Sequence, residues 1–153
     1  MTLAEESGLP DANIPSVYLK GDELGKNITL VGWGASGNVT GQSIGASDLT
    51  QDDTFRLGYN VITNIKDGLL LYRLTNGPDN TVMAAAGDSG GPMFIQTQDE
   101  LFVAGVNTKS EGEYCCNWNT RAEAKRLSDH WDWIQEILKK TYPLKDLRST
   151  NVK

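Results

Sequence analysis

The chain of 153 residues has no long apolar run and no excess of basic side chains. No segment approaches the roughly 20 apolar residues that a transmembrane helix needs. Lysine and arginine total 14 against 20 aspartates and glutamates, a formal net charge of −6, which disfavours binding to polyanions such as nucleic acids or to anionic membranes. The sequence therefore predicts neither a nucleic-acid partner nor a membrane partner.

Cysteine and histidine are also scarce. The two cysteines, Cys115 and Cys116, are neighbours in the chain, where a disulfide between them would be strained, so we expect two free thiols. The only histidine is His130, and a zinc site would need further cysteine or histidine ligands at suitable spacing. We expect neither a metal nor any other cofactor.

Glycine is abundant instead, with 16 glycines and 5 prolines between short apolar segments. This composition is typical of a turn-rich β protein, and the length suits one domain. Strands are expected over residues 27–34, 55–65, 69–74, 92–96, 101–107 and 121–127, with a short extended piece at 16–19. Six or so hairpin-linked strands predict an all-β fold, an antiparallel barrel closed by a C-terminal helix.

That helix is expected to begin at Ser128, which is well suited to cap its N-terminus. The first turn is acidic and the last turn carries lysines, so each sign of charge matches the helix dipole. Trp131, Ile134 and Leu138 repeat at helical spacing. We expect them to pack against the barrel.

One stretch follows neither helix nor strand propensity. Residues 84–95 read Ala-Ala-Ala-Gly-Asp-Ser-Gly-Gly-Pro-Met-Phe-Ile. Glycines on both sides of Ser89 favour a turn and let backbone N–H groups approach one hydroxyl, as a nucleophilic serine with an oxyanion site requires. The stretch therefore has the features that a nucleophilic serine at position 89 would need.

Gly-Asp-Ser-Gly-Gly-Pro at residues 87–92 resembles the peptide around the nucleophile of trypsin-like serine endopeptidases. Leu-Val-Gly-Trp-Gly at 30–34 is similar to the strand that opens the second barrel of that family, and residues 126–134 are similar to its final strand and helix. Residues 57–62 are most like those of bacterial-style members. These segments occur in the family's order, so the resemblance covers most of the chain.

The resemblance implies a Greek-key-type six-stranded antiparallel β-barrel with a C-terminal α-helix, the C-terminal half of a peptidase domain. We assign it to residues 16–141. Residues 1–15 are expected to form a loose lead-in, and residues 142–153 a polar tail.

The resemblance also implies a role for each of five site residues. Ser89 would be the nucleophile, and the backbone N–H groups of Gly87 and Ser89 would form the oxyanion hole. Asp88 is similar to the aspartate that pairs with a freed N-terminal ammonium and holds that hole open. Thr108 would lie beside the substrate backbone. Met83 would stand at the floor of the specificity pocket, where a methionine in place of a carboxylate predicts apolar or small substrate side chains and not lysine or arginine.

A serine hydroxyl also needs a base, because unassisted it is a poor nucleophile at neutral pH. In the family the histidine base and its orienting aspartate belong to the first barrel, and no part of this chain matches that barrel. His130 falls in the expected C-terminal helix, away from the cleft of the relatives, so we expect it to have a packing role. Besides a polypeptide substrate, we therefore expect a first-barrel chain or segment as partner, supplying the histidine and the aspartate.

Two functions remain open at this point. One is the nucleophile-bearing half of a serine endopeptidase; the other is a non-catalytic protease-like binding module, or an inactive fragment. The family's disulfide beside the nucleophile would need a cysteine near Ala85, so Cys115 or Cys116 would be what remains of its other end. The resemblance implies secretion, whereas residues 1–15 carry three carboxylates and do not resemble a signal peptide, so either the protein stays inside the cell or the natural polypeptide starts elsewhere.

Overall fold

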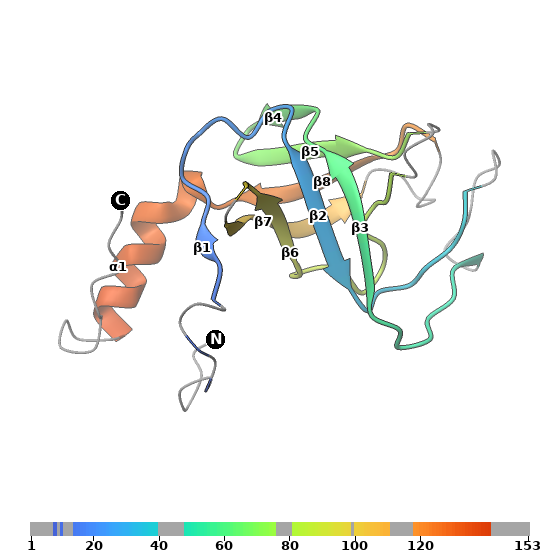
Figure 1. Ribbon diagram of the computed structural model, residues 1–153, viewed down its shortest axis with the longest axis horizontal. Coiled ribbons are helices and arrows are strands. Elements are labelled where there is room, and N and C mark those ends of the chain that lie inside the picture. Colours follow the sequence, from blue (N-terminus) through green and yellow to red (C-terminus); the bar gives the residue numbers. More distant parts are fainter. Residues whose placement is uncertain are drawn as a thin grey trace.

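The computed structural model describes residues 8, 10, 14–39, 48–75, 81–98, 100–110 and 118–141. Its strands join in one curled sheet, and a helix extends from one end of it (Figure 1). The strands are β1 (Ser16–Val17), β2 (Asn27–Gly32), β3 (Arg56–Val61), β4 (Asn64–Lys66), β5 (Leu69–Arg73), β6 (Pro92–Gln96), β7 (Leu101–Ser110) and β8 (Arg121–Arg126). A short 3₁₀ helix, η3 (Ser128–His130), leads into α1 (Trp131–Thr141).

The strand order is β3-β2-β6-β7-β8-β5-β4, and every pair along it is antiparallel. The short β1 is added in parallel to β7. Because β2 lies beside β6, and β5 beside β8, segments distant in sequence become neighbours. The prediction of an antiparallel β-barrel with one C-terminal helix is confirmed.

Asn60 of β3 links the two sides of the curled sheet where β3 comes close to β5, a place called the seam below. This side chain is 5% exposed, and its Nδ2 donates to the carbonyl oxygen of Arg73 on β5 at 2.9 Å and to that of Val82 at 2.7 Å. The N–H of Val82 donates to the carbonyl of Tyr59 at 3.0 Å. Hydrogen bonds from one buried amide thus join the two strands at the seam.

Alternation along the strands fills the barrel. In β3, Gly58 and Asn60 are buried while their neighbours point outward, as period-2 strand geometry requires. The core cluster is built from Tyr18, Ile28, Leu30, Ile62, Leu70, Tyr72, Met93, Ile95, Ala104, Ala122 and Ala124. No helix among the described residues is long and apolar enough to cross a membrane.

Several predicted boundaries shift in the structure. The strand expected over residues 55–65 is divided into β3 and β4, because Ile62 turns into the core with no exposed surface. The turn predicted at residues 66–68 is present, with Asp67 and Gly68 at φ of 52° and 71°, the positive values that tight hairpins favour. β7 continues to Ser110, past its predicted end. Cys115 and Cys116 lie outside the described residues.

The predicted cap at Ser128 is wrong. The chain already has helical dihedral angles at Leu127, and η3 has no side-chain cap. The Ser128 hydroxyl instead donates to Oε1 of Glu23 at 3.1 Å. Packing of the helix on the barrel is only partial, since Trp131 and Ile134 are half-buried and Leu138 is 38% exposed. The reason is visible in Figure 1, where α1 projects away from the strands.

Candidate active site

Ser89 lies on an exposed turn that leads into β6. Gly87 and Gly90, on either side, have φ of +98° and +84°, which L side chains rarely adopt. The Ser89 hydroxyl donates to the carbonyl oxygen of Thr108 on β7 at 3.3 Å. The glycine pattern in the sequence therefore produces the predicted turn, with the hydroxyl at the surface.

The turn is fastened to β7 by its backbone. The N–H of Gly90 donates to the carbonyl of Asn107 at 2.8 Å, and the N–H of Asn107 donates to the carbonyl of Gly91 at 2.9 Å. A Cβ on Gly91 would lie 2.9 Å from the carbonyl oxygen of Asp88, so the turn cannot accept a larger residue there without moving. This anchoring holds Ser89 in a defined position beside β7.

Two backbone N–H groups of the turn have no hydrogen-bond acceptor among the described residues. Within the described part of the chain, neither Gly87 nor Ser89 donates its N–H to another group, whereas the intervening N–H of Asp88 donates to the carbonyl of Ala85 at 3.0 Å. Free N–H groups that flank a serine hydroxyl can stabilise an oxyanion.

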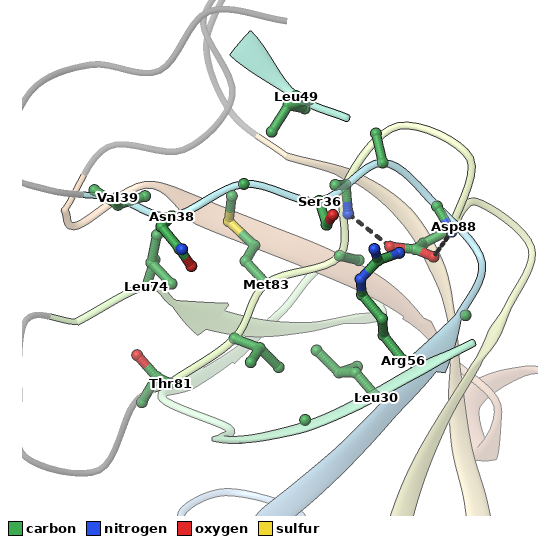
Figure 2. A pocket seen from close by; sticks show the side chains of 18 of the residues that line it. Leu30, Ser36, Asn38, Val39, Leu49, Arg56, Leu74, Thr81, Met83 and Asp88 are labelled. Carbon is green, nitrogen blue, oxygen red and sulfur yellow. Dashed lines mark hydrogen bonds between the residues drawn. The ribbon is translucent and has the colours of Figure 1, made fainter. Parts of the chain in front are cut away.

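The carboxylate of Asp88 is held by hydrogen bonds from two backbone N–H groups (Figure 2). Its Oδ1 accepts the N–H of Gly34 at 2.8 Å, and its Oδ2 accepts that of Ala85 at 2.9 Å. A Cβ added to Gly32 would lie 2.0 Å from Oδ1 of Asp88, and a Cβ added to Gly34 would lie 2.5 Å from the same oxygen. Both glycines of the Gly-Trp-Gly segment are therefore needed to admit this carboxylate.

Asp88 borders an open groove of about 910 Å³. Its walls include Leu30, Val82 and Met83, and Figure 2 shows Met83 and Asp88 on the same hollow. Arg56 also lies on the lining, but its Nη2 is paired with both carboxylate oxygens of Asp52 at 2.7 Å. The groove thus has both apolar and polar walls, and the charge of Arg56 is paired with that of Asp52.

Tyr72 supports the segment that carries Met83. Its side chain has no exposed surface, and its hydroxyl oxygen accepts the N–H of Ala84 at 3.3 Å. Burial raises the pKa of Tyr72 to about 12; the N–H of Ala84 opposes this shift and the charge of Asp88 adds to it. Tyr72 is therefore a neutral phenol over the whole physiological range.

The trypsin family model matches residues 6–134. The chain belongs to the trypsin family. It is 31% identical over 123 residues to phenoloxidase-activating factor 3 of Holotrichia diomphalia, covering 74% of this chain and 32% of the relative. It is 26% identical over 136 residues to the clotting factor G beta subunit of Tachypleus tridentatus, covering 84% of this chain and 43% of the relative. The chain thus spans less than half the length of either relative.

The structure gathers the residues to which the trypsin-family resemblance assigned roles. Met83 is half-buried, packs on the core cluster and lines the groove. Thr108 is exposed next to Ser89, and its hydroxyl donates to the carbonyl of Glu123 at 3.0 Å. His130 lies in η3, and its Nε2 has no partner among the described residues. His130 is therefore not hydrogen-bonded to Ser89, and the assigned roles themselves stay predictions.

Asn107 is a site residue that the sequence did not reveal. It is 3% exposed and lines the groove, and neither Nδ2 nor Oδ1 has a hydrogen-bond partner in the described part of the chain. The available signal was a polar amide closing the apolar run at residues 102–106. Reading it required knowing that Asn107 pairs with Ala124 of the core and so faces inward.

Proposed function

We propose that this chain is the nucleophile-bearing part of a trypsin-like serine endopeptidase. Ser89 attacks the scissile carbonyl, and the N–H groups of Gly87 and Ser89 receive the oxyanion that forms. The observation that carries the proposal is the exposed Ser89 hydroxyl beside the N–H groups of Gly87 and Ser89, which have no acceptor among the described residues, on a turn held by the hydrogen bonds of the Asp88 carboxylate.

Asp88 has the proposed task of keeping the turn open. The N–H groups of Gly34 and Ala85 that donate to it are neutral. The negative charge of the Asp88 carboxylate can therefore still attract a cation. An N-terminal ammonium seated there would neutralise the charge and fix the turn, as the family resemblance implies. The peptide substrate would run beside Thr108, with its side chain entering the groove near Met83.

We further propose that the base and its orienting aspartate come from a first-barrel polypeptide, fused or separate. An apolar face supports this partner: Trp33, Phe55, Leu57, Tyr59 and Val61 are 36–61% exposed along β3 and its flanks. Trp33 and Phe55 are in contact, with ring centroids 4.7 Å apart. A contiguous exposed apolar face on a monomer usually marks an interface, and the relatives carry more than twice the length matched here.

Labelling with a fluorophosphonate tests the proposal. The chain is incubated with the probe alone and together with a first-barrel polypeptide from a trypsin-family relative, and Ser89→Ala is the control. We expect labelling at Ser89 that becomes at least about 100-fold faster with the partner, a typical contribution of a positioned base. Absence of labelling under both conditions would overturn the proposal.

A non-catalytic binding module is the second candidate. It is favoured by the lack of a histidine ring at Ser89 among the described residues. In that case the apolar face would bind the first-barrel polypeptide, as sedimentation would show, without any gain in labelling. For either function we propose an extracellular setting, in keeping with the resemblance to secreted endopeptidases.

A further inference from the structure

We propose that Asn107 selects substrates with an uncharged amide side chain, above all glutamine, in the groove beside Ser89. The inference rests on the proposed endopeptidase function and deepens it, because it names the side chain that the pocket accepts. It also revises the expectation of an apolar or small side chain that was based on Met83.

The Asn107 amide is buried and has no hydrogen-bond partner among the described residues. An asparagine side chain offers two N–H donors and a carbonyl acceptor, and a buried polar group of this kind costs free energy when it has no partner. Asn107 is 3% exposed, yet its nitrogen and oxygen have no partner among the described residues. Asn60, which is 5% exposed, shows the ordinary case, because its nitrogen donates to two carbonyls.

Asn107 also lies beside both the groove and the nucleophile turn. Asn107 and Met83 line the same groove, and the backbone of Asn107 is bonded to Gly90 and Gly91 of the nucleophile turn. The carbonyl oxygen of the next residue, Thr108, accepts a hydrogen bond from the Ser89 hydroxyl. A substrate side chain that enters the groove from a carbonyl at Ser89 therefore passes close to the unpartnered amide.

The Asn107 amide is chemically complementary to a primary amide on the substrate. A primary amide can pair with Asn107 reciprocally, each group donating one N–H to the carbonyl of the other. A hydrocarbon side chain would leave Asn107 unpaired, and sites built to hydrogen-bond a substrate reject analogues that lack the matching group. A charged side chain would lose its hydration without meeting a counter-charge at Asn107. The methylenes of glutamine would lie against Met83, which packs on the core cluster.

The binding part is tested on this chain by following the side-chain ¹⁵NH₂ signals of Asn107 during titration with propionamide. We expect a saturable shift, at least about ten-fold weaker binding of 2-butanone, which only accepts hydrogen bonds, and no change in the Asn60 signals. Asn107→Leu should abolish propionamide binding, with Asn107→Ser as a second variant if the first does not fold. Unmoved Asn107 signals, equal affinity for 2-butanone, or a bound water that propionamide does not displace would each overturn the inference.

Peptidyl phosphonates separate this inference from the proposed function. With the first-barrel polypeptide present, Ser89 should react at least about ten-fold faster with a glutamine-like side chain than with a norleucine side chain, and Asn107→Leu should remove the difference. Equal rates for the two reagents would overturn the specificity while leaving the endopeptidase in place. Reaction with neither reagent would overturn the endopeptidase, and the titration would then decide the role of Asn107 alone.

Discussion

At the scale of single residues, the Asp88 carboxylate fits into the site only because two neighbouring residues are glycines without side chains. Its carboxylate occupies the space where Cβ atoms of Gly32 and Gly34 would be. It also joins the nucleophile turn to a segment 54 residues earlier through the N–H of Gly34. A small change at either glycine should therefore alter the reactivity of Ser89.

Gly34→Ala should displace the Asp88 carboxylate, because the new Cβ would lie 2.5 Å from Oδ1. Without its anchor the nucleophile turn rearranges, and we expect fluorophosphonate labelling of Ser89 in the reconstituted protein to fall at least about 100-fold, the lower end of the range for loss of one oxyanion contact.

Gly25→Ala is the matched control. Gly25 also has positive φ, at +77°, but no atom lies within 4 Å of the added Cβ. This variant should lose about 1 kcal/mol of stability through backbone strain and keep its labelling rate. Equal labelling of the two variants would show that Asp88 does not hold the turn.

The raised pKa of Tyr72 predicts that the protein loses stability at alkaline pH. Its pKa is raised by burial from 10.0 to about 12, so the folded protein keeps a proton that the unfolded chain loses. The associated stabilisation is complete below pH 10 and is lost as the pH rises toward 12, at up to about 1.4 kcal/mol per pH unit. Urea unfolding of Tyr72→Phe between pH 9 and 12 should lack this slope, whereas Tyr59→Phe, on the exposed face, should retain it.

At the scale of elements, a buried ion pair fastens the segment before β2 to the junction of β8 and η3. Glu23 has no exposed surface, and its carboxylate accepts hydrogen bonds from Nε and Nη2 of Arg126 at 3.0 and 2.8 Å. Burial alone would raise the pKa of Glu23, but the hydrogen bonds from Arg126 and Ser128 outweigh it and the pKa lies below its ordinary value. Two distant parts of the chain are thereby held at one point.

Glu23→Gln should destabilise the protein by about 3 kcal/mol, the cost of breaking a buried pair. Because the pKa of Glu23 is lowered in the folded state, the wild-type stabilisation is present above the ordinary carboxyl value and is lost as the pH falls through the folded one. Chemical unfolding at pH 7 and pH 3 measures both effects.

The exposed pair of Glu136 and Lys140 is the control for Glu23. Both side chains are more than 60% exposed, and exposed pairs contribute about 0.5 kcal/mol or less. A Glu136→Gln variant as unstable as Glu23→Gln would contradict the importance of burial.

At the scale of the whole molecule, the apolar face along β3 is the feature that most needs a partner. Replacing Leu57 and Tyr59 together by threonine keeps β propensity and removes two side chains that are 54% and 61% exposed. We expect at least about ten-fold weaker binding of the first-barrel polypeptide in sedimentation velocity, consistent with the loss of central interface anchors. Leu24→Thr, which changes a side chain of 61% exposure outside this face, should leave this binding unchanged.

Local features of the sequence determined the nucleophile turn, the β-rich pattern and the C-terminal helix. Glycines at positive φ and alternating apolar residues act through neighbouring residues in the chain, so they can be read without a structure. The boundary at Ile62 was missed because burial in the barrel core sets it. The end of β7 at Ser110 was missed because pairing with Ala122 of β8 sets it.

Only the tertiary structure decided which distant groups meet. The Asp88 carboxylate lies against Gly32 and Gly34 because β2 neighbours β6. The hydroxyl of Ser128 does not cap the helix because the folded chain places Glu23 within hydrogen-bonding distance of it. The inward direction of Asn107 follows from its pairing with Ala124. Hydrogen bonds and burial of this kind depend on strand order, which sequence spacing does not contain.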